Sequence, residues 1–188
     1  MLIEHERSIL EIDSSAYVAP NATICGNVSI GGATRIMFGA SIVAEGAPIT
    51  IGDICIVMEM ALSAAQMCMP RAPEHICHVG PNSHLVDCVV EDCVFIATGA
   101  SIFHGAVIEY GAKIRINAVV HLRTRFPRFS VVPIRCIAVG DPVAVLPPDQ
   151  HDAIWTIQKP MDFPPYIYGV PTPTRRGYQH GVDSQAAL

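Results

Sequence analysis

Hydrophobic residues return every six positions along most of this chain. Isoleucine, valine or leucine holds this register in two runs: Val18, Ile24, Ile30, Ile36, Ile42, Ile51 and Val57, then Val79, Leu85, Val90, Ile96, Ile102, Ile108, Ile114 and Val120. The exceptions are a longer step from Ile42 to Ile51 and a five-residue step from Leu85 to Val90. A small residue commonly stands two positions earlier, as at Ala22, Ala40, Ala100 and Ala112. A period of six suits neither an α-helix, at 3.6, nor a single β-strand, at 2.

Such a repeat is typical of a parallel β-helix, in which short strands alternate with tight turns and aliphatic side chains point inward. Gly or Asn between the apolar positions, as at Gly39, Gly99 and Asn117, tolerates the left-handed backbone that tight corners need. Three hexapeptides per coil give a left-handed triangular prism. We therefore predict an all-β, left-handed parallel β-helix over residues 1–147.

Two stretches interrupt the repeat. Residues 44–50, "AEGAPIT", predict a short outward loop, and residues 63–78, "SAAQMCMPRAPEHICH", predict a longer excursion. Loops that leave a solenoid often carry its function. The role of the longer excursion is open, and a lid over a binding site is one interpretation.

The C-terminal part predicts two further segments. Residues 148–160 read as a helix, with Asp149 as its N-cap and Pro160 as its end. The side chains expected to pack it on the prism are Ala153, Ile154, Trp155 and Ile157. Residues 161–188 are rich in proline and predict an extended or disordered tail.

Composition narrows the class of protein. The 188 residues are 51% hydrophobic with a mean hydropathy of +0.38, yet no apolar run reaches the roughly 18 residues of a membrane span. No export signal is recognised at the start. Seven cysteines, an odd number without a CxxC, favour a reducing cytoplasm. The net charge of −5 and the scattered positions of the twelve Lys and Arg argue against nucleic acid as a partner.

Several stretches together resemble the gamma-class carbonic anhydrase-like family of left-handed β-helix proteins, over about residues 10 to 160. They are "GASIVAEGAPITIG", "IATGASIFHGAVI" and "IAVGDPVAVL". The resemblance implies a trimer that holds a zinc ion between subunits through three histidines. One histidine follows a pattern N-I-Q-D-x-x-V-I-H, and the other two lie in G-H-x-x-x-L-H-G-C.

The matching stretches of this chain lack all three histidines. "IVMEMALSA" leaves Ala64 at the first ligand position, and "GPNSHLVDC" leaves Pro81 and Val86 at the other two. A catalytic zinc needs about three protein ligands to acidify its bound water, and these side chains donate nothing. Carbonic anhydrase activity through the usual site is therefore not expected, although a relocated zinc or other divalent metal stays possible.

A displaced site is the first alternative. His104 follows Val86 by 18 residues, one full coil, which predicts the same lateral position one layer along. His84 precedes Val86 by two and should face the same side of its strand. With Glu59, and with Glu45 at the family's acidic position, they are the candidate catalytic residues. His84 and His104 are also the candidate metal ligands; the plainer interpretation is that both are surface or interface histidines.

Other reactive residues have weaker patterns. His75, Cys77 and His78 form a short cluster without a second cluster to complete a metal site. Cys88 and Cys93 read as buried, although His84 would be the base if Cys88 were a nucleophile. Four methionines predict either core and interface filling or an apolar substrate pocket: Met58, Met60, Met67 and Met69.

Three functions remain open at this stage. The first is a homotrimeric carbonic anhydrase-like enzyme, a lyase or hydrolase that has diverged from CO2 hydration and uses a small molecule at the subunit interface. The second is a hexapeptide-repeat acyltransferase using an acyl-CoA, with His104 as its base. The third is a non-catalytic trimeric scaffold. A threefold ring is expected because one face of the prism can close it, and neither nucleic acid nor membrane is an expected partner.

Overall fold

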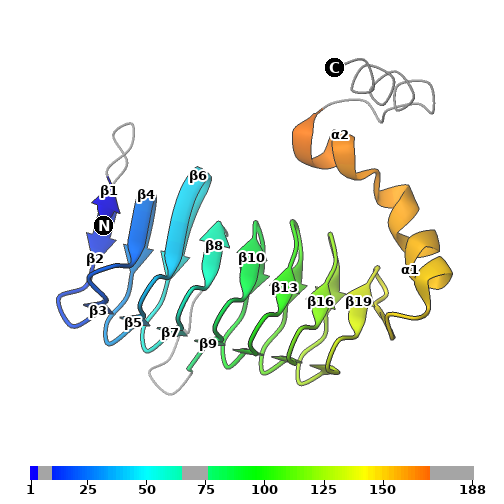
Figure 1. The fold of residues 1–188 in the computed structure, drawn as a ribbon, viewed down its shortest axis with the longest axis horizontal. Coiled ribbons are helices and arrows are strands. Elements are labelled where there is room, and N and C mark those ends of the chain that lie inside the picture. The colour runs from blue at the N-terminus through cyan, green and yellow to red at the C-terminus, as the bar shows by residue number, and fades with distance from the viewer. Residues whose placement is uncertain (4–9, 65–75, 170–188) are drawn as a thin grey trace, which may run out of the picture.

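The predicted left-handed parallel β-helix is confirmed in a computed structural model that describes residues 1–3, 10–64 and 76–169. Short strands stack along one axis in three sheets, and the helices follow at the C-terminal end (Figure 1). Sheet A contains β1 (Leu2–Ile3), β2 (Leu10–Ile12), β4 (Thr23–Ile30), β6 (Ser41–Ile51), β8 (Leu62–Ala64), β10 (His84–Val86), β13 (Ser101–Ile102), β16 (Val119–Val120), β19 (Ile137–Val139) and β20 (Ala144–Leu146).

The other two sheets close the triangle. Sheet B contains β3 (Tyr17–Val18), β5 (Arg35–Ile36), β7 (Ile56–Val57), β9 (His78–Val79), β12 (Phe95–Ile96), β15 (Lys113–Ile114) and β18 (Val131–Val132). Sheet C contains β11 (Val89–Val90), β14 (Val107–Ile108) and β17 (Arg125–Phe126). All strand pairs are parallel except β19 with β20.

The aliphatic ladder fills the prism. Ile24, Ile42, Leu85, Ile102 and the rest of the two runs are at most 2% exposed, apart from Val18 at the N-terminal end, which is partly buried. The ladder also continues further than the sequence analysis proposed, through Phe126, Val132 and Ala138 at unbroken steps of six. The core therefore extends into the last coil.

Both interruptions are absorbed without breaking the stack. Between β4 and β6, Gly26 pairs with Ala44 and Val28 with Ile49, so the extra residues of β6 produce a shift of register inside that strand rather than a separate loop at 44–50. Most of the second excursion, residues 65–75, lies outside the described residues. Ile56 and Val57 still pair directly with His78 and Val79 on its far side.

The C-terminal helix is present, but its details differ from the prediction. Helix α1 (His151–Gln158) has Gln150 rather than Asp149 at its N-cap, and η1 (Lys159–Met161) continues through Pro160. Ile154 is buried, whereas Ala153 is exposed and Trp155 is 53% exposed, so these two do not anchor the helix.

A second helix, α2 (Phe163–Tyr168), lies where an extended tail was predicted. Its Tyr166 ring stacks under the Arg123 guanidinium at 4.7 Å, which fastens α2 to the turn after β16. The rest of the tail, residues 170–188, lies outside the described residues. No helix in the described ranges is long and apolar enough to cross a membrane.

Candidate functional site

In the resembling family three positions carry the zinc ligands. Here they lie at the two ends of the strands of sheet A. Ala64 and Val86 end β8 and β10 and are directly paired in the ladder. Pro81 lies at the opposite end, in the turn between β9 and β10. Pro81 and Val86 are five positions apart in the chain, a span of at most about 16 Å. In a single chain, these positions therefore face two different corners of the prism.

The predicted catalytic residues are spread over this region rather than gathered. His84 opens β10, points outward and is half-buried between Leu62 and Ser101. Glu59 lies in the turn after β7, where its carbonyl accepts a hydrogen bond from the N–H of Asn82. Glu45 lies in β6, and its side chain is outside the described part of the structure. Among the described side chains, no three His, Cys, Asp or Glu groups cluster as a metal site requires.

The predicted position of His104 is wrong. Strand β10 pairs with β13 through His84–Ser101 and Leu85–Ile102, a spacing of 17 rather than 18 residues. The residue beside Val86 is therefore Phe103, and the N–H of Gly105 donates to the carbonyl of Asp87, which puts His104 in the turn. The cause is the five-residue step from Leu85 to Val90, which shortens this coil by one.

A histidine that the sequence analysis missed does occupy the column of Val86. His121 lies two coils further along, and its ring packs against Phe103 with centroids 5.9 Å apart. Its Nδ1 is buried without a hydrogen-bond partner, as is Nδ1 of His104. Burial also lowers the pKa of His121, so the ring is neutral at pH 7. The signal was available as spacings of 17 and 18 residues from Val86.

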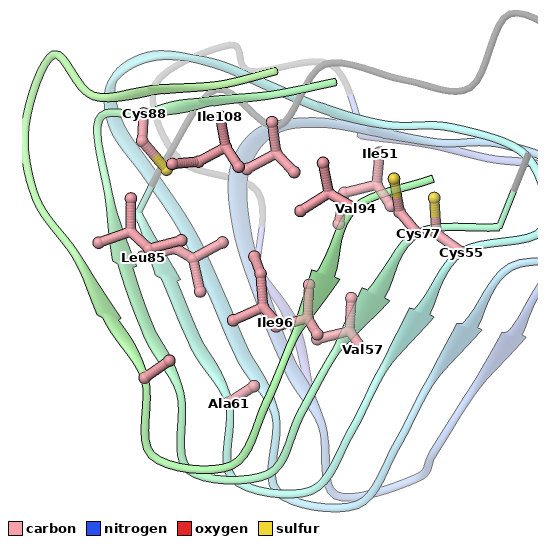
Figure 2. Close-up of a cluster of buried hydrophobic side chains, with 14 of the residues drawn as sticks. Ile51, Cys55, Val57, Ala61, Cys77, Leu85, Cys88, Val94, Ile96 and Ile108 are labelled. Carbon is pink, nitrogen blue, oxygen red and sulfur yellow. The ribbon is translucent and has the colours of Figure 1, made fainter. Parts of the chain in front are cut away.

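Cys55, Cys77 and Cys88 belong to the core, whereas Cys93, predicted to be buried, is only partly so, and its Sγ donates to the hydroxyl of Tyr110 at 3.5 Å. Figure 2 shows Cys88 inside the prism near Ile108, and the sulfurs of Cys55 and Cys77 beside one another. Burial raises the pKa of Cys88 to about 12, and a thiol hydrogen bond to Cys77 together with burial raises that of Cys55. Because His84 points outward while Cys88 points inward, His84 does not activate Cys88 as a nucleophile.

The remaining predicted ligands separate in the same way. Cys77 is 3% exposed and its Sγ donates to the carbonyl of Glu91 at 3.2 Å. His78 points outward and stacks on Phe95, with ring centroids 4.9 Å apart and planes 5° from parallel. His75 lies outside the described residues. The described part of "HICH" therefore turns one residue into the core and the next to the surface.

A groove of about 580 Å³ lies on the sheet B side of Pro81. Its lining is largely apolar and comes from successive coils: Met58, His78, Gly80, Pro81, Phe95, Ala97, Thr98, Arg115, Ile116 and Ile134. The volume falls in the range of small-molecule sites, which are mostly apolar with a few polar groups. Met58 thus lines a pocket, whereas Met60 is 62% exposed; Met67 and Met69 lie outside the described residues.

Comparison with known proteins confirms the family resemblance. The chain is 28% identical over 126 residues to "Gamma carbonic anhydrase 1, mitochondrial" of Arabidopsis thaliana, covering 64% of this chain and 46% of that protein. It is 30% identical over 96 residues to "Gamma carbonic anhydrase 3, mitochondrial" of the same plant, covering 48% and 37%. The chain thus spans less than half the length of these relatives. No family model matches it.

Solved structures support the fold alone. A Bacillus cereus protein named as an acetyltransferase superposes with a TM-score of 0.58 at 24% identity, over 84% of this chain and 90% of that one. A hexapeptide transferase family protein of Anaplasma phagocytophilum gives 0.56 at 20% identity over the same shares. The chain is therefore similar to gamma carbonic anhydrases in sequence and to hexapeptide-repeat proteins in architecture.

Proposed function

We propose that this chain forms a gamma-carbonic anhydrase-like homotrimer that has lost zinc-dependent CO2 hydration and binds a small molecule at the subunit boundary. The observation that carries the proposal is the chemistry of the three ligand positions. Ala64 and Val86 pair in the ladder as two ligands of one ion would, and Pro81 stands at the third position. None of these side chains can bind a metal.

The same three positions support a trimer. Pro81 and the Ala64–Val86 pair lie at opposite ends of the strands of sheet A. They can surround one point only when Pro81 of a second copy lies beside the Ala64–Val86 pair of the first. Repeating that contact around a threefold axis closes a ring. The groove beside Pro81 would then open onto the boundary between copies.

His84, Glu59, His104 and Glu45 are retained in this proposal as residues near the boundary, with a carboxylate or imidazole as the acid or base if a reaction occurs. Because no three His, Cys, Asp or Glu side chains cluster among the described residues of one copy, a displaced metal site built from them would need ligands from more than one copy. The described cysteines are all free thiols, which supports a reducing compartment such as the cytoplasm.

The test combines molecular mass, metal content and CO2 hydration on the purified chain. We expect a trimer without stoichiometric zinc and without hydration above background. The triple variant Ala64→His/Pro81→His/Val86→His should bind about one zinc ion per subunit if the three positions converge between copies. The double variant Ala64→His/Val86→His is its control and should bind zinc far more weakly, because a ligand is missing.

Two results would overturn the proposal. Stoichiometric zinc with hydration in the unmodified trimer would mean a working relocated site, to be traced with His84→Ala and His104→Ala. A monomer, or a trimeric triple variant that ignores zinc, would mean that the three positions do not meet between copies.

A further inference from the structure

The groove beside Pro81 results from an alternation of large and small side chains along one outward column. Met58, Gly80, Ala97 and Arg115 each follow a strand of sheet B, and each donates its N–H to a carbonyl of the next coil. Glycine and alanine thus lie between a methionine and an arginine. Because successive coils lie about 4.8 Å apart, the two small residues leave a hollow two coils long between the two large ones.

The floor of this hollow has no room for a larger residue at Gly80. A Cβ added there would lie 2.7 Å from the amide nitrogen of Thr98 and 2.8 Å from the carbonyl carbon of Ala97. Both atoms are backbone and cannot move aside independently. The glycine is therefore a requirement of the close approach between coils, and it makes the hollow a fixed feature of the chain.

The walls are apolar and the single fixed charge is positive. Phe95, stacked on His78, forms one side, and Ile116 and Ile134, 46% and 59% exposed, form the end next to Arg115. Burial lowers the pKa of His78, which keeps its ring neutral at pH 7. No acidic residue lines the groove, and within the described ranges Arg115 has no ion-pair partner.

Arg115 also lies in a stretch of the sequence that is rich in basic residues. Six of the twelve basic residues fall between positions 113 and 135, and the sequence holds no Asp or Glu between Glu109 and Asp141. The basic residues are therefore not scattered, as the sequence analysis held. The two other basic residues nearest in register, Lys113 and Arg135, are exposed but do not line the groove.

We propose that this groove binds an apolar monocarboxylate, with its hydrocarbon body over Gly80 and Ala97 and its carboxylate on the guanidinium of Arg115. The planar fork of arginine matches a carboxylate through two parallel hydrogen bonds. One cation in an apolar hollow suits a single negative charge better than a dianion such as a phosphate monoester. This inference rests on the proposed function, because it names the ligand class of the same subunit boundary.

The experiment uses 4-fluorobenzoate as the probe and 4-fluorobenzamide as its neutral counterpart, both followed by fluorine NMR on the full-length assembly. Benzoate should bind and the amide should bind at least tenfold more weakly, because a hydrogen bond to a charged group is worth about 1.5–3 kcal/mol. Arg115→Gln should weaken benzoate binding by a similar factor. Arg115→Lys should retain part of it.

Two matched variants separate the groove from its neighbourhood. Arg135→Gln removes an exposed arginine from the same end of the prism but from outside the lining, and it should leave binding unchanged. Ala97→Leu fills the floor and should abolish binding. Its circular dichroism and assembly mass should match those of the unmodified chain, which shows that the loss comes from the filled groove.

The outcomes are distinguishable from those for the proposed function. Absence of benzoate binding, as would follow if a second copy of the chain filled the groove, overturns this inference. Tighter binding of phenyl phosphate than of benzoate overturns the ligand class, and equal binding by Arg115→Gln overturns the role of Arg115. Zinc-dependent hydration would overturn the proposed function instead, and the Arg115 dependence of benzoate binding would still be measurable.

Discussion

The inside and outside of the prism follow the same coil spacing but differ in how uniform their side chains are. On the inside of sheet A, Leu85, Ile102 and Val120 stack in register and are at most 1% exposed. On the outside, the residues that directly follow the strands of sheet B form a column with the same backbone hydrogen bonds from coil to coil. This column holds methionine, glycine, alanine and arginine at positions 58, 80, 97 and 115. The interior repeats one kind of residue, whereas the exterior varies.

The difference arises from packing. Inside the prism, each side chain contacts the equivalent side chains of the coils above and below, so one shape repeated is the stable solution. Outside, backbone hydrogen bonds keep the register, and side-chain volume can vary where the side chain reaches solvent, as at Arg115, but not at Gly80. A groove is built where small residues interrupt large ones. Information about the fold therefore lies in the repeat, and information about the site lies in departures from it.

Truncation of an interior side chain should have the largest effect on stability. Ile102→Ala removes most of a side chain that is 1% exposed between Leu85 and Val120, and we expect the free energy of unfolding to fall by about 2–5 kcal/mol. The control is Ile116→Ala, which shortens a side chain 46% exposed on the outside and should cost about 0.5 kcal/mol or less. Urea unfolding measures both, and similar losses would mean that inside and outside do not differ in packing.

Addition of a single methyl group should sharpen the comparison on the outside. Gly80→Ala forces a Cβ against backbone atoms of the next coil, and we expect a loss of about 1–3 kcal/mol. Gly32→Ala is its control, because the nearest atom there is the Ser15 side-chain oxygen at 3.2 Å, which needs to shift by only a few tenths of an ångström. If Gly80→Ala were as stable as Gly32→Ala, the close approach between coils at Gly80 would be wrong.

The fold could be predicted because its signal repeats. Each buried residue of the ladder supplies the same six-residue evidence, so single exceptions do not hide the pattern. The helix at the C-terminus was predicted in place but not in its contacts, because Trp155 is apolar in the sequence yet exposed in the structure. Hydrophobicity alone does not say which side of a short helix meets the prism.

The site was harder to predict because it depends on register between coils. A single five-residue step moved His104 off the column of Val86 and brought Phe103 and His121 into it. The groove was missed for a related reason. Gly80 and Ala97 are unremarkable along the chain and form a hollow only when the 17-residue coil stacks one on the other. An error of one residue in the assumed coil length does not change the predicted fold. It does change which side chains are predicted to lie together at the site.

His121 lies on the outside of the prism but is largely buried, as interior residues are. Substituting it should have the smallest effect on stability of the changes discussed. Its folded-state pKa is lowered by burial below the roughly 6.5 of an unfolded chain. The unfolded state therefore binds more protons between those two values, so the free energy of unfolding should fall as the pH drops below about 6.5. His121→Phe keeps a ring against Phe103 and removes the titration, so urea unfolding at pH 7.5 and 5.5 should show a smaller fall than in the unmodified chain.

Some fall should persist, since burial lowers the pKa of His78 as well. His151→Ala, at an exposed residue of α1, should keep the full pH dependence, and an equal fall in His121→Phe would show that His121 is not buried in solution.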